Sequence, residues 1–115
     1  MIVSGEVKDM IGSIVEVTVD RPMGSTHPKH KDLYYPINYG YVKGIMGGDG
    51  EEQDAYILGV DHPVAKFTGR VIAIIHRLDD VEDKWVVAPE GIVFSQSEII
   101  DAVSFQEKYF KFEII

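Results

Sequence analysis

The chain has 115 residues, of which 45% are hydrophobic, a composition that favours one globular domain with its own core. It has no cysteine, which excludes disulfides and thiolate metal sites, and no apolar run approaches the roughly 20 residues of a membrane span. The formal net charge of −8 opposes nucleic-acid binding, because each phosphate-backbone contact needs a positive group. We therefore expect a single cytoplasmic domain over residues 1–115, with neither nucleic acid nor membrane as a partner.

Five short stretches rich in β-branched residues predict strands, and turn-forming residues separate them. In chain order these stretches are residues 13–19, 39–42, 55–60, 71–75 and 85–88.

The C-terminal part changes to a helical period. Ser95 and Glu98 have the spacing of a capping box before an apolar face, and Ser104 and Glu107 offer a second box. Residues 112–115 alternate and predict an edge strand or a docked tail. The predicted fold class is mainly β with α: a small, closed, five-stranded, OB-like β-barrel with one or two C-terminal helices.

The most unusual segment is a glycine-rich loop that carries four carboxylates within six positions. They belong to Asp49, Glu51, Glu52 and Asp54. Unpaired, such charges repel by about 1 kcal/mol per pair at 4 Å even in water, and a cation would relieve the repulsion. A solvated acidic turn is the alternative interpretation.

A second acidic turn at residues 79–83 also lies between two apolar strands. Two such turns make a joint site plausible, and oxygen ligands without cysteine favour Mg²⁺ or Mn²⁺. Two metal ions can clamp a phosphoanhydride and lower the pKa of a bridging water until it attacks phosphorus.

A third set of residues, within 22–29 and 34–41, offers lysine and tyrosine donors for phosphate oxygens. For any single tyrosine, such as Tyr35 or Tyr41, a place in the core or at its rim is the alternative.

These three segments, in this order, resemble soluble inorganic pyrophosphatases of the metal-dependent, single-domain barrel type. Residues 35–40 fit that family's Y-P-x-N-Y-G pattern in full, and residues 49–54 resemble its D-G-D-x-x-D signature. Residues 22–25 followed by Lys29 are similar to its P-x-G-S element and lysine. The likeness covers roughly residues 13–110.

The resemblance implies metal-dependent hydrolysis of inorganic pyrophosphate by a metal-activated water, with Mg²⁺ as cofactor and Mn²⁺ as a possible substitute. It also implies a homo-oligomer. It assigns the metal ligands to Asp49, Asp54, Asp79 and Asp83, with Asp80 as a rival of Asp79. It assigns Glu51 to deprotonation of the water and Tyr39 to catalysis. The substrate-binding residues that it implies are Lys29, Tyr39, Lys84 and Tyr109.

The chain departs from the family pattern at several points. The hairpin between Lys29 and residue 35, with its phosphate-binding arginine, is missing, and Glu51 replaces an aspartate. The extra methylene would move the base by about an ångström, which can cost 10²-fold in rate. Lys84 follows Asp83 directly, one place earlier than expected, and Phe110 replaces a lysine. Two alternatives stay open: a hydrolase of another small phosphoanhydride or phosphate ester, and a non-catalytic metal- or phosphate-binding barrel.

Overall fold

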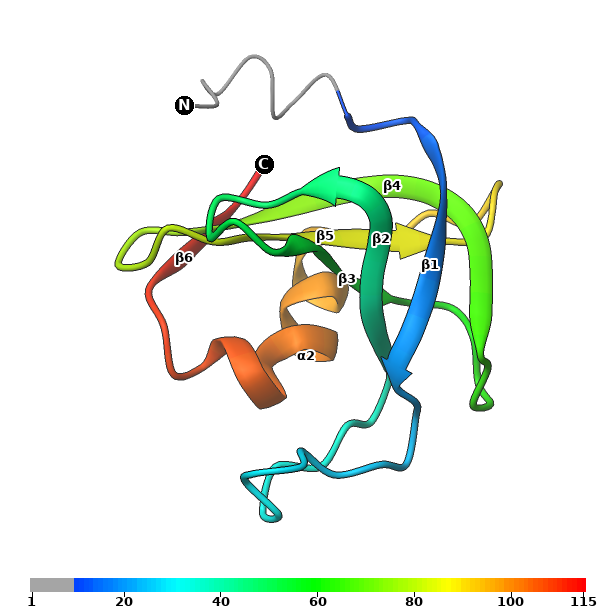
Figure 1. The fold of residues 1–115 in the computed structure, drawn as a ribbon. Coiled ribbons are helices and arrows are strands. Elements are labelled where there is room, and N and C mark those ends of the chain that lie inside the picture. Colours follow the sequence, from blue (N-terminus) through cyan, green and yellow to red (C-terminus); the bar gives the residue numbers. More distant parts are fainter. Residues whose placement is uncertain (1–9) are drawn as a thin grey trace.

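The computed structural model describes residues 10–115, whose strands form one curved sheet that closes on itself (Figure 1). The strands are β1 (Ile14–Arg21), β2 (Asn38–Met46), β3 (Glu52–Ile57), β4 (Lys66–Arg77), β5 (Asp83–Ala88) and β6 (Phe112–Ile114), with helix α2 (Gln96–Glu107) between β5 and β6. The order in the sheet is β1-β2-β3-β5-β4-β6, and a further pairing of β1 with β4 closes the first five into a barrel. The predicted mainly-β fold, a closed five-stranded barrel with a C-terminal helix, is confirmed.

Strand β4 closes the barrel because it is long enough to serve two neighbours. Residues 66–70 pair with β1, and residues 70–76 pair with β5, with a register shift inside this second pairing between Val71 and Ala73. Strand β3 runs parallel to β5, whereas the other pairs are antiparallel. Strand β6 adds to the far end of β4, so the alternating tail is an edge strand, one of its two predicted arrangements.

Two apolar clusters occupy the two faces of the barrel wall. Along β3, Ala55 and Ile57 belong to one cluster, and Tyr56 between them belongs to the other, as the two-residue period of a strand requires. The second cluster also contains Ile99 and Val103 of α2, so it fills the space between the barrel's outer face and the helix. The first cluster, which contains Trp85, therefore fills the barrel interior.

The helix begins at the first predicted capping box. The Ser95 side chain accepts from the Glu98 backbone N–H, and the Glu98 side chain accepts from the Ser95 backbone N–H. The second predicted box lies inside the same helix, where the Ser104 hydroxyl instead donates to the Asp101 carbonyl. One helix therefore covers both boxes. Within residues 10–115, no helix is long and apolar enough to cross a membrane.

Candidate functional site

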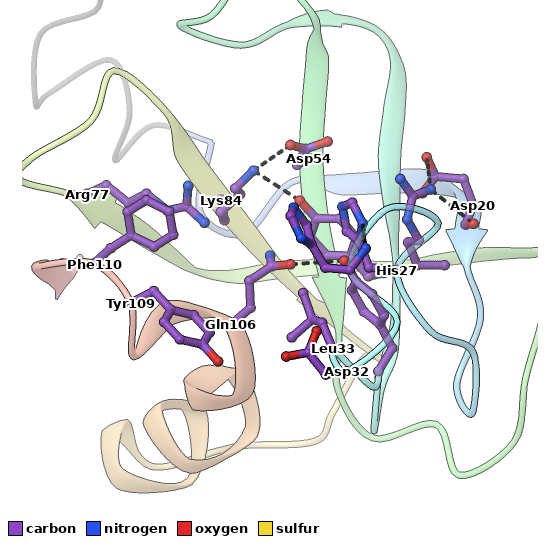
Figure 2. A pocket seen from close by; sticks show the side chains of 14 residues that line it. Asp20, His27, Asp32, Leu33, Asp54, Arg77, Lys84, Gln106, Tyr109 and Phe110 are labelled. Carbon is purple, nitrogen blue, oxygen red and sulfur yellow. Dashed lines mark hydrogen bonds and ion pairs between the residues drawn. The ribbon is translucent and has the colours of Figure 1, made fainter.

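A cavity of about 630 Å³ lies on the outer face of the barrel, beside the C-terminal end of α2 (Figure 2). Strands β2, β3, β4 and β5 each contribute one side chain to its wall, and the loop between β1 and β2 contributes several. Its basic lining residues are Arg21, His27, His30, Arg77 and Lys84, and its acidic ones are Asp20, Asp32 and Asp54. Both signs of charge therefore meet in one partly enclosed space.

Lys84 is the buried cation at the centre of this wall, with 4% of its surface exposed. Its Nζ donates to the Tyr39 hydroxyl at 3.0 Å and forms ion pairs with Asp54 at 2.5 Å and Glu82 at 3.2 Å. Burial lowers the pKa of Lys84, but Tyr39 and Asp54 outweigh this and leave the pKa above its ordinary value. Lys84 is therefore a fixed positive charge at neutral pH.

The Tyr39 phenol is held neutral beside this lysine. Only 8% of Tyr39 is exposed, and burial raises its pKa well above 10.0. Lys84 donates to its oxygen, and a hydrogen bond with Asp54 also raises its pKa, so Asp54 is the acceptor beside the phenolic hydrogen. Tyr39 is therefore a neutral hydrogen-bond donor at the cavity wall.

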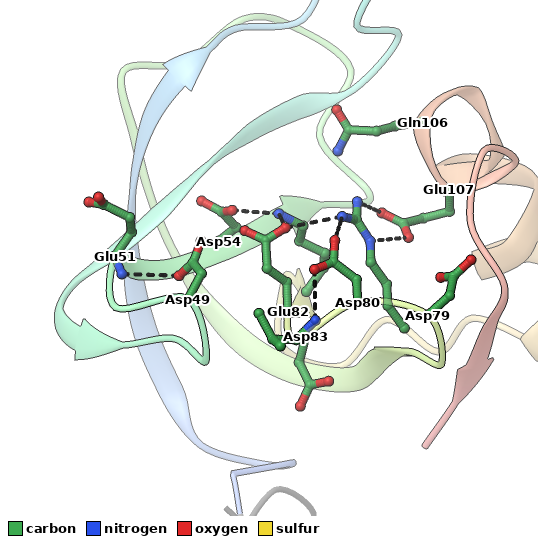
Figure 3. Close-up of polar contacts among 12 residues, drawn as sticks. Asp49, Glu51, Asp54, Asp79, Asp80, Glu82, Asp83, Gln106 and Glu107 are labelled. Carbon is green, nitrogen blue, oxygen red and sulfur yellow. Dashed lines mark hydrogen bonds and ion pairs between the residues drawn. The ribbon is translucent and has the colours of Figure 1, made fainter. Parts of the chain in front are cut away.

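Arg77 is a second buried cation, and carboxylates surround it (Figure 3). Its Nε and Nη2 donate to the two oxygens of Glu107 at 2.9 and 2.8 Å, while Nη1 reaches Glu82 at 3.0 Å and Asp80 at 3.3 Å. The guanidinium carbon lies 3.6 Å from the centre of the Phe110 ring. The residue thus joins the end of β4 to the end of α2 and neutralises part of the second acidic turn.

The two acidic turns lie against each other, as their sequence suggested. A Cβ added at Gly48 would overlap the Val81 carbonyl oxygen, so only glycine allows this approach. A hydrogen bond with Glu82 lowers the pKa of Asp49, whereas burial, followed by the same hydrogen bond, raises the pKa of Glu82. Glu82, which was not among the expected ligands, therefore faces both Asp49 and Lys84.

Asp83 lies on the opposite face of β5. It pairs with His76 across the β4–β5 register, and its Oδ1 is 2.7 Å from His76 Nδ1. Because alternate residues of a strand point to opposite faces, Asp83 cannot share the face of Lys84. Sequence analysis placed Lys84 one position too early after Asp83. If the carboxylate is counted from Glu82 instead, Lys84 has the spacing that the pattern expects.

Two more of the predicted acidic residues lie outside the cavity wall. Both oxygens of Asp79 accept from the Lys111 backbone N–H at 3.3 Å, next to β6. Glu51 is exposed, and its backbone N–H donates to Asp49 at 3.0 Å. Of the four predicted metal ligands, only Asp54 lines the cavity.

The predicted substrate-binding residues are also divided. Tyr39, Lys84 and Tyr109 line the cavity, and Tyr109 does so from the end of α2 with 66% of its surface exposed. Lys29 is exposed in the loop and does not line the cavity; its backbone N–H donates to His27 Nδ1.

Sequence analysis gave no role to Arg21, the last residue of β1. It lines the cavity, and one of its Nη atoms lies 3.3 Å from the Asp20 carboxylate. Its Nε is buried and has no hydrogen-bond partner within residues 10–115. A buried donor without a partner is costly, and a bound anion would satisfy it. The position of Arg21 near the end of a predicted strand was the available signal, but the pairing of β1 with β2, which places Arg21 opposite Tyr39, was needed to interpret it.

The fit of these residues to a divalent metal is incomplete. Asp49, Asp54 and Glu82 are hard oxygen donors that gather around Lys84. However, Lys84 and Arg77 already neutralise Asp54 and Glu82, and residues 10–115 contain no group of three or more acidic or histidine side chains arranged to hold a metal. The structure does not assemble the predicted set of four aspartates.

Comparison with solved structures identifies the fold. The chain is similar to an inorganic pyrophosphatase from Neisseria gonorrhoeae (22% identity, TM-score 0.66, covering 85% of this chain and 74% of that one). It is also similar to inorganic pyrophosphatases from Ehrlichia chaffeensis (19%, TM-score 0.67, covering 90% and 85%) and Helicobacter pylori (18%, TM-score 0.64, covering 88% and 82%). No protein-family model and no curated protein matches the sequence. The chain therefore has the fold that these pyrophosphatases share, confirming the resemblance at the level of fold.

Proposed function

We propose that this chain hydrolyses a small phosphoanhydride, with inorganic pyrophosphate as the first candidate substrate. The observation that carries the proposal is the buried Lys84, which holds Tyr39 and Asp54 at the wall of a cavity in a barrel with the fold of inorganic pyrophosphatases. Hydrolysis adds one water across the P–O–P bridge. The water oxygen bonds to one phosphorus, the bridging P–O bond breaks, and the water protons pass to the two phosphate products.

Four of the cavity residues have parts in this proposal. Lys84 and Arg21 bind the non-bridging oxygens, and Tyr39 donates its phenolic hydrogen to one of them. Asp54 accepts a hydrogen bond from the attacking water and orients it. The predicted role of Glu51 as base remains part of the proposal, although Glu51 lies outside the cavity wall.

The proposed cofactor is Mg²⁺ or Mn²⁺, and the carboxylates that offer oxygen ligands are Asp49, Asp54 and Glu82. When bound, such an ion supplies positive charge to phosphate and lowers the pKa of water. Because Lys84 and Arg77 already pair with two of these side chains, the metal requirement needs its own test. The predicted homo-oligomer also remains a proposal, which light scattering in solution would check.

The test measures phosphate release from pyrophosphate with Mg²⁺, with Mn²⁺ and with a chelator, for the parent chain and for Asp54→Asn. We expect turnover that needs a divalent ion and falls about 100-fold or more in the variant, as for loss of a group that acts on the reacting water. Asp61→Asn is the matched control, because the Asp61 side chain is fully exposed and does not line the cavity. Equal rates in Asp54→Asn and the parent would contradict the proposed site.

A second candidate is a barrel that binds phosphate compounds without hydrolysing them. The observation in its favour is that Arg77 and Lys84 already neutralise the carboxylates that a catalytic metal would need. Calorimetric binding of pyrophosphate in the presence of a chelator, together with no phosphate release under any condition, would support this candidate over the first.

A further inference from the structure

A second hollow with different chemistry adjoins the cavity. This hollow, of about 250 Å³, shares Asp32, Leu33 and Tyr109 with the main cavity. Its other lining residues are Tyr34, Pro36, Phe105 and Lys108. Figure 2 shows Tyr109 beside the end of the helix and Leu33 with Asp32 on the loop. The two hollows therefore adjoin at these three residues, and we refer to them together as the groove.

The side chains change in character along this groove. At the inner end Lys84 and Arg21 carry positive charges, each beside a carboxylate, and the buried Nε of Arg21 has no partner within residues 10–115. At the junction Asp32 supplies an exposed carboxylate, and Lys108 adds a cation to the outer hollow. At the outer end two tyrosine rings are open to solvent, Tyr34 with 54% and Tyr109 with 66% of their surface exposed. Rings of this size usually bury much of their surface, so two exposed ones beside one hollow indicate a surface for stacking.

Pyrophosphate has no group that would use the outer end. It is a compact anion without an apolar part, whereas cavities of several hundred Å³ with aromatic walls usually receive larger organic ligands. A ligand that fills the groove needs phosphate at one end, a hydroxyl-bearing part in the middle and a planar ring at the other end.

We propose that the groove binds a nucleoside diphosphate, with its phosphates at Lys84 and Arg21, its ribose at Asp32 and its base between Tyr34 and Tyr109. This inference names the substrate class of the proposed hydrolysis and rests on that function for the inner end of the groove. A carboxylate suits ribose hydroxyl donors, and aromatic side chains stack on any base. Water would attack the terminal phosphorus, the anhydride P–O bond would break, and the products would be phosphate and a nucleoside monophosphate.

The test is calorimetric binding of ADP, pyrophosphate and adenosine to the full chain, with and without Mg²⁺. We expect ADP to bind about tenfold or more tightly than pyrophosphate, and adenosine alone to bind weakly. Tyr34→Ala should lower the ratio of ADP to pyrophosphate affinity about tenfold, whereas Tyr34→Phe, which keeps the ring, should leave that ratio unchanged.

The outcomes separate this inference from the proposed hydrolysis, because binding does not require turnover. Tyr34-dependent ADP binding without phosphate release would support the groove and contradict the hydrolysis. Pyrophosphate hydrolysis with no preference for ADP would support the hydrolysis and contradict the nucleotide groove. The inference is overturned if ADP does not bind, or if Tyr34→Ala weakens ADP and pyrophosphate equally. Val93→Ala, at an apolar residue that is 90% exposed outside both hollows, is the control for unspecific loss.

Discussion

At the scale of single residues, three buried tyrosines test whether water is excluded from this side of the barrel: Tyr35 and Tyr39, which line the cavity, and Tyr56, which packs against Tyr39. Burial raises the pKa of Tyr35, Tyr39 and Tyr56 above the ordinary 10.0. We expect these phenols to ionise later than usual in a spectrophotometric pH titration, and Tyr39→Phe to remove one late-titrating group. The unfolded chain releases such protons near pH 10, whereas the folded chain retains them. The free energy of unfolding should therefore be unaffected by these groups below pH 10 and fall as the pH rises further. Ionisation of all tyrosines near pH 10 without unfolding would contradict the buried wall.

The candidate residues could be predicted only in part, because the sequence gives residue types but not faces. Tyr39, Asp54, Lys84 and Tyr109 were selected by their motifs, and they line the cavity. Asp83 lies on the opposite face of its strand, and its neighbour Glu82 meets Lys84 instead. A one-residue change of register reverses every side chain of a strand, so a motif match that is off by one place selects a carboxylate on the opposite face.

At the scale of elements, helix α2 begins at a capping box whose side chains satisfy backbone donors of its first turn. Ser95→Ala should remove the side-chain acceptor for the Glu98 backbone N–H and lower the free energy of unfolding by about 1 kcal/mol. Ser104→Ala is the matched control, since that hydroxyl lies inside the helix and only donates to the Asp101 carbonyl. Chemical denaturation measures both changes. An equal effect of the two variants would show that the cap does not set the start of the helix.

The element-scale predictions succeeded where the pattern was local. All five barrel strands overlap predicted segments and the helix begins at the Ser95 cap, but β3 lies three residues earlier than its predicted segment 55–60, and β4 extends to Lys66–Arg77. Its first part escaped prediction because Thr68, Gly69 and Arg70 interrupt the apolar run. Those residues are nevertheless strand, because they pair with β1 to close the barrel. Barrel closure depends on pairing between segments that are distant in the sequence, so the hydrophobic periodicity of either segment alone does not predict it.

At the scale of the whole molecule, the strong negative charge has to be reconciled with a site for anions. The formal charge is −8, yet the two buried side chains Lys84 and Arg77 each lie among carboxylates at the barrel's helix side. Of these two cations, Arg77 is the one that connects the barrel to helix α2. Its partner Glu107, at the end of the helix, is fully buried, and the two Glu107 oxygens accept from this guanidinium and from the Tyr56 hydroxyl. Without the arginine, a buried carboxyl group would be left with no cation beside it.

Arg77→Gln should therefore destabilise the chain by about 3–5 kcal/mol, the usual cost of removing one partner of a buried ion pair. Arg70→Gln is the matched control, because Arg70 pairs with Glu90 at 2.6 Å in an exposed position, where such pairs contribute about 0–1 kcal/mol. Each variant changes the net charge from −8 to −9, so the overall repulsion is the same and only the local network differs.

The measurement is denaturant unfolding of both variants with a chelator and with Mg²⁺. If Mg²⁺ reaches Glu82 and Asp80 once Arg77 is gone, it should restore part of the stability of Arg77→Gln alone. Equal losses in the two variants would mean that the helix is held to the barrel by apolar packing and not by this arginine.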